Sequence, residues 1–172
     1  MKKTIFLALA FHLAIFAAAQ NDPEFPKGYI MHFKLHNGMV TNFKAAPDLY
    51  VGGFQLVPQC TVVPHLLRAG IIADGYYTGK KLQAAFGPTV SLKIKTLQAG
   101  IFGSAGNLHL SFDHLWGTEH QKLVGGGINA DVGNLIVIGV TSHYDYGHSN
   151  WWFQSSVGIR IGKRTKTPEP FN

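Results

Sequence analysis

The stretch 135–161 constrains the fold of this chain most, because its side chains alternate in character at every residue. In its first half the even positions from Ile136 to Tyr146 share one face, and in its second half the odd positions from Trp151 to Ile161 do so. A period of two residues is typical of a half-buried β-strand. Each half has about a dozen residues, which is roughly twice the usual strand length and enough for a tilted strand to cross a bilayer.

The same alternation recurs along the chain and predicts six earlier strands: 29–43, 49–63, 66–79, 82–97, 107–117 and 120–133. Asn37-Gly38 is a strong hairpin signal, so 29–43 reads either as one strand or as a small hairpin. With 29–43 as one strand the chain has eight strands, and short connections imply antiparallel neighbours. We therefore predict an all-β fold, an eight-stranded antiparallel up-and-down barrel, and its strand length favours a transmembrane one.

The amino terminus reads as a secretory signal peptide over residues 1–19. Lys2 and Lys3 precede an apolar run over 5–16, which ends at three small residues, 17–19. This run is shorter than the ~20 residues of a membrane-spanning helix, and a core helix is the alternative. We divide the rest into an extended lead-in at 20–28, a β-barrel at 29–162 and a basic, proline-containing tail at 163–172. The signal peptide predicts export.

Charge and composition limit the classes of partner. Charged residues are 14% of the chain, below the usual ~25%, while hydrophobic residues are 46%. The formal charge of +6 becomes +4 without the two signal-peptide lysines (6 minus 2), and much of the remainder lies in the tail. No basic stripe interleaves with aromatic residues, so we predict no nucleic-acid partner. Cys60 is the only cysteine, which excludes an intrachain disulfide and CxxC metal sites.

Glycines and aromatic residues favour an apolar surface that faces lipid. Glycines recur on the polar face, as expected where side chains crowd a narrow interior: Gly87, Gly125, Gly127, Gly139 and Gly158. In an antiparallel meander, the ends of the third, fifth and seventh strands and the start of the eighth meet at one rim. That rim holds a predicted aromatic girdle: Tyr76, Tyr77, Trp116, Tyr144, Tyr146, Trp151 and Trp152. Such a girdle marks a membrane interface, the alternative being that the rings cap an ordinary core.

In strand number, strand length and this aromatic rim, residues 29–162 resemble the small eight-stranded bacterial outer-membrane barrels of the OmpA and OmpX type. The resemblance is one of architecture and includes no sequence motif. It implies that membrane lipid surrounds the barrel in a bacterial outer membrane. It also implies that the aromatic rim faces outward and that both termini are periplasmic.

With the polar faces turned inward, the pattern predicts a polar network in the lumen. Its members are Arg68, Asp74, Lys93, Lys95, His109, Asp113, Asn129, Asp131, His143, Asp145 and Arg160. The interior of an eight-stranded barrel is just wide enough for side chains to fill it. A buried charge needs a partner, so we expect these groups to pair with one another, Asp131 with Arg160 or a lysine, and to close the lumen.

Two sharper hypotheses start from the acidic end of this network. Asp74, Asp113, His143 and Asp145 together offer carboxylate and imidazole ligands for a divalent cation. Polar pairs two residues apart are common on strands, so we predict no metal and no cofactor. Lipid A deacylases are eight-stranded outer-membrane enzymes that use a histidine, a serine and an acid. The residues of this chain most similar to that set are His148 and Ser149 with Asp145. Adjacent residues on a strand point to opposite faces, so we predict no catalytic residues.

These observations favour a non-enzymatic outer-membrane barrel with a closed or narrow lumen and a structural or interaction role in the cell envelope. The alternative is a soluble exported barrel, similar to lipocalins, that binds an apolar ligand in its interior. A lipid A-modifying hydrolase is a third hypothesis. The first two differ in which face of the sheet lies inside, and the sequence indicates no protein partner.

Overall fold

Eight β-strands make up most of the part of the chain that a computed structural model describes, residues 28–44, 48–97, 106–132 and 135–162. The strands are β1 (Tyr29–Thr41), β2 (Leu49–Val63), β3 (Leu67–Thr78), β4 (Lys81–Leu97), β5 (Gly106–Gly117), β6 (Lys122–Val132), β7 (Ile136–Asp145) and β8 (Asn150–Gly162). The predicted signal peptide, the tail and all but one residue of the lead-in lie outside the described residues. Within those ranges, no helix has the length and apolar character that a membrane crossing requires.

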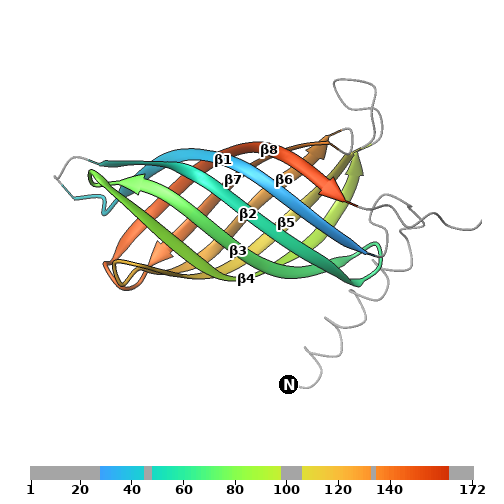
Figure 1. Cartoon of the computed structure of the whole chain (residues 1–172), viewed down its shortest axis with the longest axis horizontal. Coiled ribbons are helices and arrows are strands. Elements are labelled where there is room, and N and C mark those ends of the chain that lie inside the picture. The colour runs from blue at the N-terminus through green and yellow to red at the C-terminus, as the bar shows by residue number, and fades with distance from the viewer. Residues whose placement is uncertain (1–27, 45–47, 98–105, 133–134, 163–172) are drawn as a thin grey trace, which may run out of the picture.

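The strands form one closed sheet in chain order. Each strand pairs antiparallel with the next, and β1 pairs with β8 to complete the barrel (Figure 1). This confirms the predicted all-β, eight-stranded antiparallel barrel. β1 is continuous through Asn37, which lies opposite Gly52 on β2 and Ser155 on β8, so the hairpin alternative for this segment is wrong. β1 begins and β8 ends at one rim, the terminal rim, and the β7–β8 turn lies at the other, which we call the aromatic rim.

The two faces of the barrel wall have opposite polarity. On β1, His32 and Lys34 point inward and are buried, whereas Phe33 and Leu35 between them point outward and are exposed. Among the described residues, 22 polar or charged residues are buried against 11 apolar ones, and 30 large apolar residues are exposed. Soluble proteins bury mostly apolar side chains and expose charged ones, so this barrel is inverted relative to a soluble fold.

The interior is apolar at the aromatic rim. An apolar layer there takes one residue from each of seven strands: Val40, Val51, Tyr76, Ala85, Leu115, Leu123 and Trp152. The Tyr76 ring meets the Trp152 ring edge to face, with centroids 5.3 Å apart. Polar groups predicted near this rim, among them Asp145 and His143, are buried there as expected. The apolar layer was not predicted, and it helps to close this end of the barrel with packed rings and aliphatic side chains.

Inward glycines let the strands curl around the narrow interior. A Cβ atom added at Gly87 would overlap the backbone oxygen of His114 on β5, and one added at Gly158 would overlap that of Phe33 on β1. Only glycine tolerates so close an approach of the neighbouring strand, and bends at such positions allow a small barrel to close.

Candidate functional site

The lumen contains all but one of the residues predicted for its polar network. Arg68, Asp74, Lys93, His109, Asp113, Asn129, Asp131, His143 and Asp145 are buried, and the side chain of Arg160 is 8% exposed. Lys95 is the exception, and its prediction was wrong. Lys93 pairs with His109 but Lys95 pairs with Leu108, so a β-bulge at Ile94 breaks the alternation and turns Lys95 to the exposed outer face.

Asp131 is the centre of the charged group near the terminal rim. Its side chain is 1% exposed, and Arg160 donates from Nη1 to its Oδ2 at 3.1 Å, which is the predicted pair. Arg68 Nη1 lies 3.9 Å from the same oxygen, and His32 Nε2 lies 3.8 Å from Oδ1. His32 in turn stacks on His109, with ring centroids 6.3 Å apart. One carboxylate therefore faces groups from β1, β3 and β8 and ties these strands to β6.

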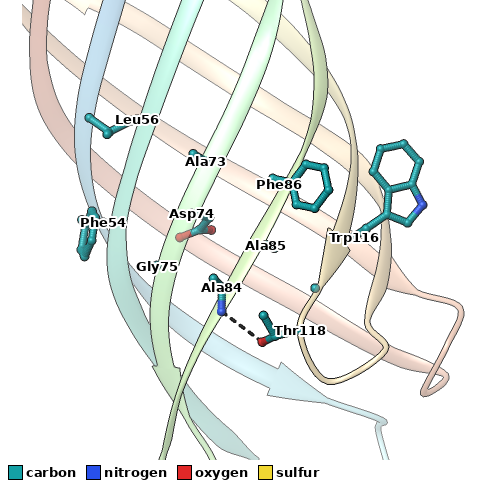
Figure 2. Close-up of a pocket in the computed structure, with 11 residues that line it drawn as sticks. Phe54, Leu56, Ala73, Asp74, Gly75, Ala84, Ala85, Phe86, Trp116 and Thr118 are labelled. Carbon is teal, nitrogen blue, oxygen red and sulfur yellow. Dashed lines mark hydrogen bonds between the residues drawn. The ribbon is translucent and has the colours of Figure 1, made fainter.

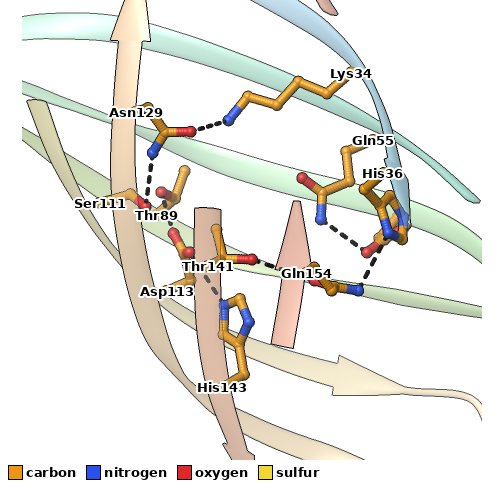
Figure 3. Close-up of polar contacts among 11 residues, drawn as sticks. Lys34, His36, Gln55, Thr89, Ser111, Asp113, Asn129, Thr141, His143 and Gln154 are labelled. Atoms are coloured by element: carbon orange, nitrogen blue, oxygen red, sulfur yellow. Dashed lines mark hydrogen bonds and ion pairs between the residues drawn. The ribbon is translucent and has the colours of Figure 1, made fainter. Parts of the chain in front are cut away.

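A second group lies around Asp74, and most of its members were not predicted from the sequence. The His36 ring is 2.8 Å from Asp74 Oδ1 through Nε2, and Gln55 donates to Oδ2 at 2.9 Å (Figure 3). Gln154 donates to His36 Nδ1 at 3.2 Å and accepts from Thr141 at 3.4 Å. Because Nδ1 accepts from the amide, the ring donates from Nε2 to the carboxylate. The sequence signal for His36 is that it shares one face of the predicted strand 29–43 with His32 and Lys34.

The third group joins β4, β5 and β7 through Asp113. Thr89 donates to its Oδ1 at 2.5 Å, and the His143 ring lies 3.2 Å from its Oδ2. Beside it, Lys34 donates from Nζ to Asn129 Oδ1 at 2.8 Å, a bond that crosses the lumen (Figure 3). Neither Lys34 nor Thr89 was predicted. Each buried carboxylate in these groups thus has donors from other strands, as a low-dielectric interior requires.

Little free space remains among these groups. The interior cavity measures about 20 Å³ and is lined by polar side chains that include Lys34, Asp113 and His143. A space of this size holds about one water molecule. This interior cavity is therefore too small for a small-molecule ligand.

Of the four residues of the cation hypothesis, Asp113 and His143 contact each other, but Asp74 and Asp145 have other partners. Asp74 bonds to His36 and Gln55, and Asp113 bonds to Thr89 and His143. Asp145 accepts from the backbone N–H groups of the β7–β8 turn and of β6 instead. In the described ranges, no three histidine, cysteine or acidic side chains are placed together to hold a metal ion.

The nearest approach to a catalytic arrangement is in the β7–β8 turn. His148 Nδ1 lies 2.9 Å from Asp145 Oδ2, and the His148 side chain is half exposed. A carboxylate orients the imidazole of a nucleophilic dyad in this way, but the base must also reach a nucleophile. Ser149 is adjacent in a turn with a φ of 58°, and no hydrogen bond joins its hydroxyl to the His148 ring. The turn therefore holds a positioned histidine without a nucleophile bonded to it.

The predicted aromatic girdle divides between the two faces. Tyr77, Trp116, Tyr146 and Trp151 are exposed on the outer face, and Tyr144 is partly exposed. Tyr144 and Trp151 pack together there, with ring centroids 5.2 Å apart. Tyr76 and Trp152 belong to the buried apolar layer, so their assignment to the girdle was wrong. The alternation itself carried this signal, because neighbouring residues on a strand point to opposite faces.

Comparison with known proteins adds a structural resemblance. No protein-family model matches the chain, and no curated protein matches it. Among solved structures, a chain described as "De novo design of transmembrane beta-barrels" is similar, with 12% sequence identity and a TM-score of 0.46. The match covers 80% of this chain and 97% of that one.

Proposed function

We propose that this protein is a transmembrane β-barrel of the bacterial outer membrane, exported by its amino-terminal signal peptide. It is non-enzymatic, has a closed lumen and serves a structural or interaction role in the cell envelope, with membrane lipid as its surrounding partner. We place the aromatic rim at the cell exterior and the terminal rim at the periplasm.

The observation that carries the proposal is the polarity of the wall. Exposed apolar side chains cover the outer face on every strand, for example Phe86, Val140 and Ile159, while the inward residues between them bond to one another. Soluble monomers rarely expose contiguous apolar patches above a few hundred Å². A closed barrel also satisfies its backbone hydrogen bonds internally, which is the condition for placing a sheet in hydrocarbon.

The soluble alternative requires the opposite arrangement. A lipocalin-like barrel needs an apolar cavity of about 300 Å³ or more for its ligand and a polar exterior. An interior cavity instead measures about 20 Å³ and is lined mostly by polar residues. Turning the apolar face inward would place charged groups such as Arg68 and Asp131 in water and break the pair between Arg160 and Asp131.

Membrane fractionation of the whole chain tests the proposal. The protein is expressed with its own amino-terminal segment in a Gram-negative host, and unheated and boiled samples of each fraction are compared on a gel. We expect the protein in the outer-membrane fraction, with a band that shifts on heating because the closed barrel resists unfolding by detergent until it is boiled. A soluble periplasmic product without a heat shift would overturn the proposal.

A further inference from the structure

The outer face of the described barrel contains a groove. It lies over β3 and β4 next to the aromatic rim, where the outward residues Ala73, Gly75 and Ala84 are small (Figure 2). Phe54 forms one side wall on β2, and Phe86 with Trp116 forms the other. The groove measures about 430 Å³, and its lining is almost entirely apolar.

The end of the groove toward the aromatic rim is polar. Thr118 begins the β5–β6 turn and closes the groove there, since its hydroxyl accepts from the Ala84 N–H at 3.3 Å and its own N–H donates to the Ala84 carbonyl at 2.9 Å. Lys81 reaches the same turn through Glu119, with 3.2 Å between Nζ and Oε1. Both side chains are at least half exposed, so this ion pair is weak and Lys81 can exchange Glu119 for another anion.

A second lysine flanks the turn from the other side. Lys122 follows the turn as the first residue of β6, and it lies opposite Trp116, the wall of the groove. Its Nζ sits 5.9 Å from the Tyr146 ring, whose hydroxyl is 2.9 Å from His114 Nε2. Lys81 and Lys122 together exceed the single charge of Glu119, so the polar end of the groove attracts anions.

We propose that this groove binds one acyl chain of an anionic membrane lipid, with the phosphate of its head group held between Lys81 and Lys122. The inference deepens the function proposed above and rests on it, because the groove meets lipid only if the barrel lies in a bilayer. The apolar groove matches a hydrocarbon chain. The lysines and Thr118 lie at the aromatic rim, which would be at the membrane interface, where lipid head groups are found.

Fluorescence quenching by brominated lipids tests the site, because Trp116 forms its wall. The full chain carrying Trp151→Phe is refolded into phosphatidylcholine vesicles, which leaves Trp116 as the exposed tryptophan and Trp152 as a buried background. Phosphatidylglycerol or phosphatidylcholine with brominated chains is then added at the same low fraction. We expect the initial slope of quenching to be about fivefold steeper for the anionic lipid, the enrichment that one lysine near a membrane surface produces.

The matched control carries Trp116→Phe, so that Trp151 on β8 reports from the same rim outside the groove. We expect the two brominated lipids to quench this variant equally. In the Trp116 reporter, Ala84→Leu fills the groove and Lys81→Gln with Lys122→Gln removes its charge. All three positions are exposed, so the barrel should fold, and each change should abolish the preference for the anionic lipid.

Every other outcome overturns the proposed lipid site. The outcomes also separate failure of this site from failure of the membrane location. Equal quenching of Trp116 by both lipids, or a preference that survives Ala84→Leu, refutes the groove and leaves the bilayer location standing. Quenching of Trp151 without quenching of Trp116 means that protein, such as a second copy of this chain, covers the groove. No quenching of either tryptophan refutes the bilayer location itself.

Discussion

Trp151 and Trp152 are neighbours on β8, yet their surroundings are opposite. Trp151 is 39% exposed on the outer face beside Tyr144, whereas Trp152 is 3% exposed in the apolar layer against Tyr76. Outward and inward residues differ in the same way along the rest of the wall, where the outward groups are exposed and apolar and most of the buried groups are polar. Alternation along a strand therefore specifies two faces, but the surrounding medium decides which face is stable on the outside.

The inner face also differs between its two ends. Near the aromatic rim it is closed by packed rings and aliphatic groups, and near the terminal rim by charges around Asp131. The first kind of closure gains stability from packing, and the second depends on every charge keeping its partner. The inner face should therefore be most sensitive where a single carboxylate serves several cations.

The largest effect should follow removal of that carboxylate. Asp131→Leu removes the buried carboxylate to which Arg160 donates and which Arg68 faces at 3.9 Å, and we expect a loss of about 3–5 kcal/mol in the free energy of unfolding. Urea unfolding of the refolded barrel in detergent micelles, followed by tryptophan fluorescence, measures it. Glu119→Gln breaks the exposed pair with Lys81 and should cost no more than about 1 kcal/mol. Equal losses in the two variants would mean that burial does not set the strength of these pairs.

A charged residue introduced on the outer face should have the next largest effect on stability. The size of this effect should depend on how deep the residue lies in the membrane. Ile128 and Ile161 are 49% and 52% exposed, but Ile128 lies mid-strand and Ile161 lies at the terminal rim. In lipid vesicles, Ile128→Arg should cost about 2–4 kcal/mol and Ile161→Arg about 0–1 kcal/mol. Unfolding of both variants from vesicles gives the comparison. A soluble barrel would tolerate both charges alike, so equal values contradict a membrane location.

Substitution of an inward glycine should have the third largest effect on stability. Gly158→Val places a side chain against the Phe33 carbonyl on β1 and should destabilise the barrel by about 1–3 kcal/mol through overpacking. The outward control Gly75→Ala meets only the Phe54 ring, at 3.0 Å, which can move aside. Urea unfolding in micelles compares the two variants. A Gly158 variant as stable as the control would show that the barrel closes without this bend.

The smallest expected effect has the opposite sign. The Tyr76 hydroxyl is buried and has no hydrogen-bond partner among the described residues. Tyr76→Phe removes a desolvated polar group and should stabilise the barrel by about 1 kcal/mol. Tyr77→Phe on the outer face should change stability by less than about 0.5 kcal/mol. A loss of stability on Tyr76→Phe, measured by the same unfolding assay, would mean that this hydroxyl is bonded inside the layer.

Most of the fold and much of the inner face could be predicted from local pattern. Alternation within each strand identified the inward positions of Arg68, Asp131 and Arg160 without knowledge of any other strand. Lys95 was misplaced because a bulge depends on pairing between two strands, which the pattern of one strand does not contain. Tyr76 and Trp152 were misplaced because residue type and rim position were given more weight than their face.

The sequence by itself determined seven of the strands, their antiparallel order and the two faces of the wall, because period-two alternation and short connections are local properties. That 29–43 contains one strand was decided by its pairing with both β2 and β8. Only the tertiary structure decided which polar groups meet. Lys34 and Asn129 are 95 residues apart, and His36 and Gln154 are 118 apart. Such partners face each other only after β8 has closed on β1, and the stagger of that closure sets the height of every side chain in the lumen.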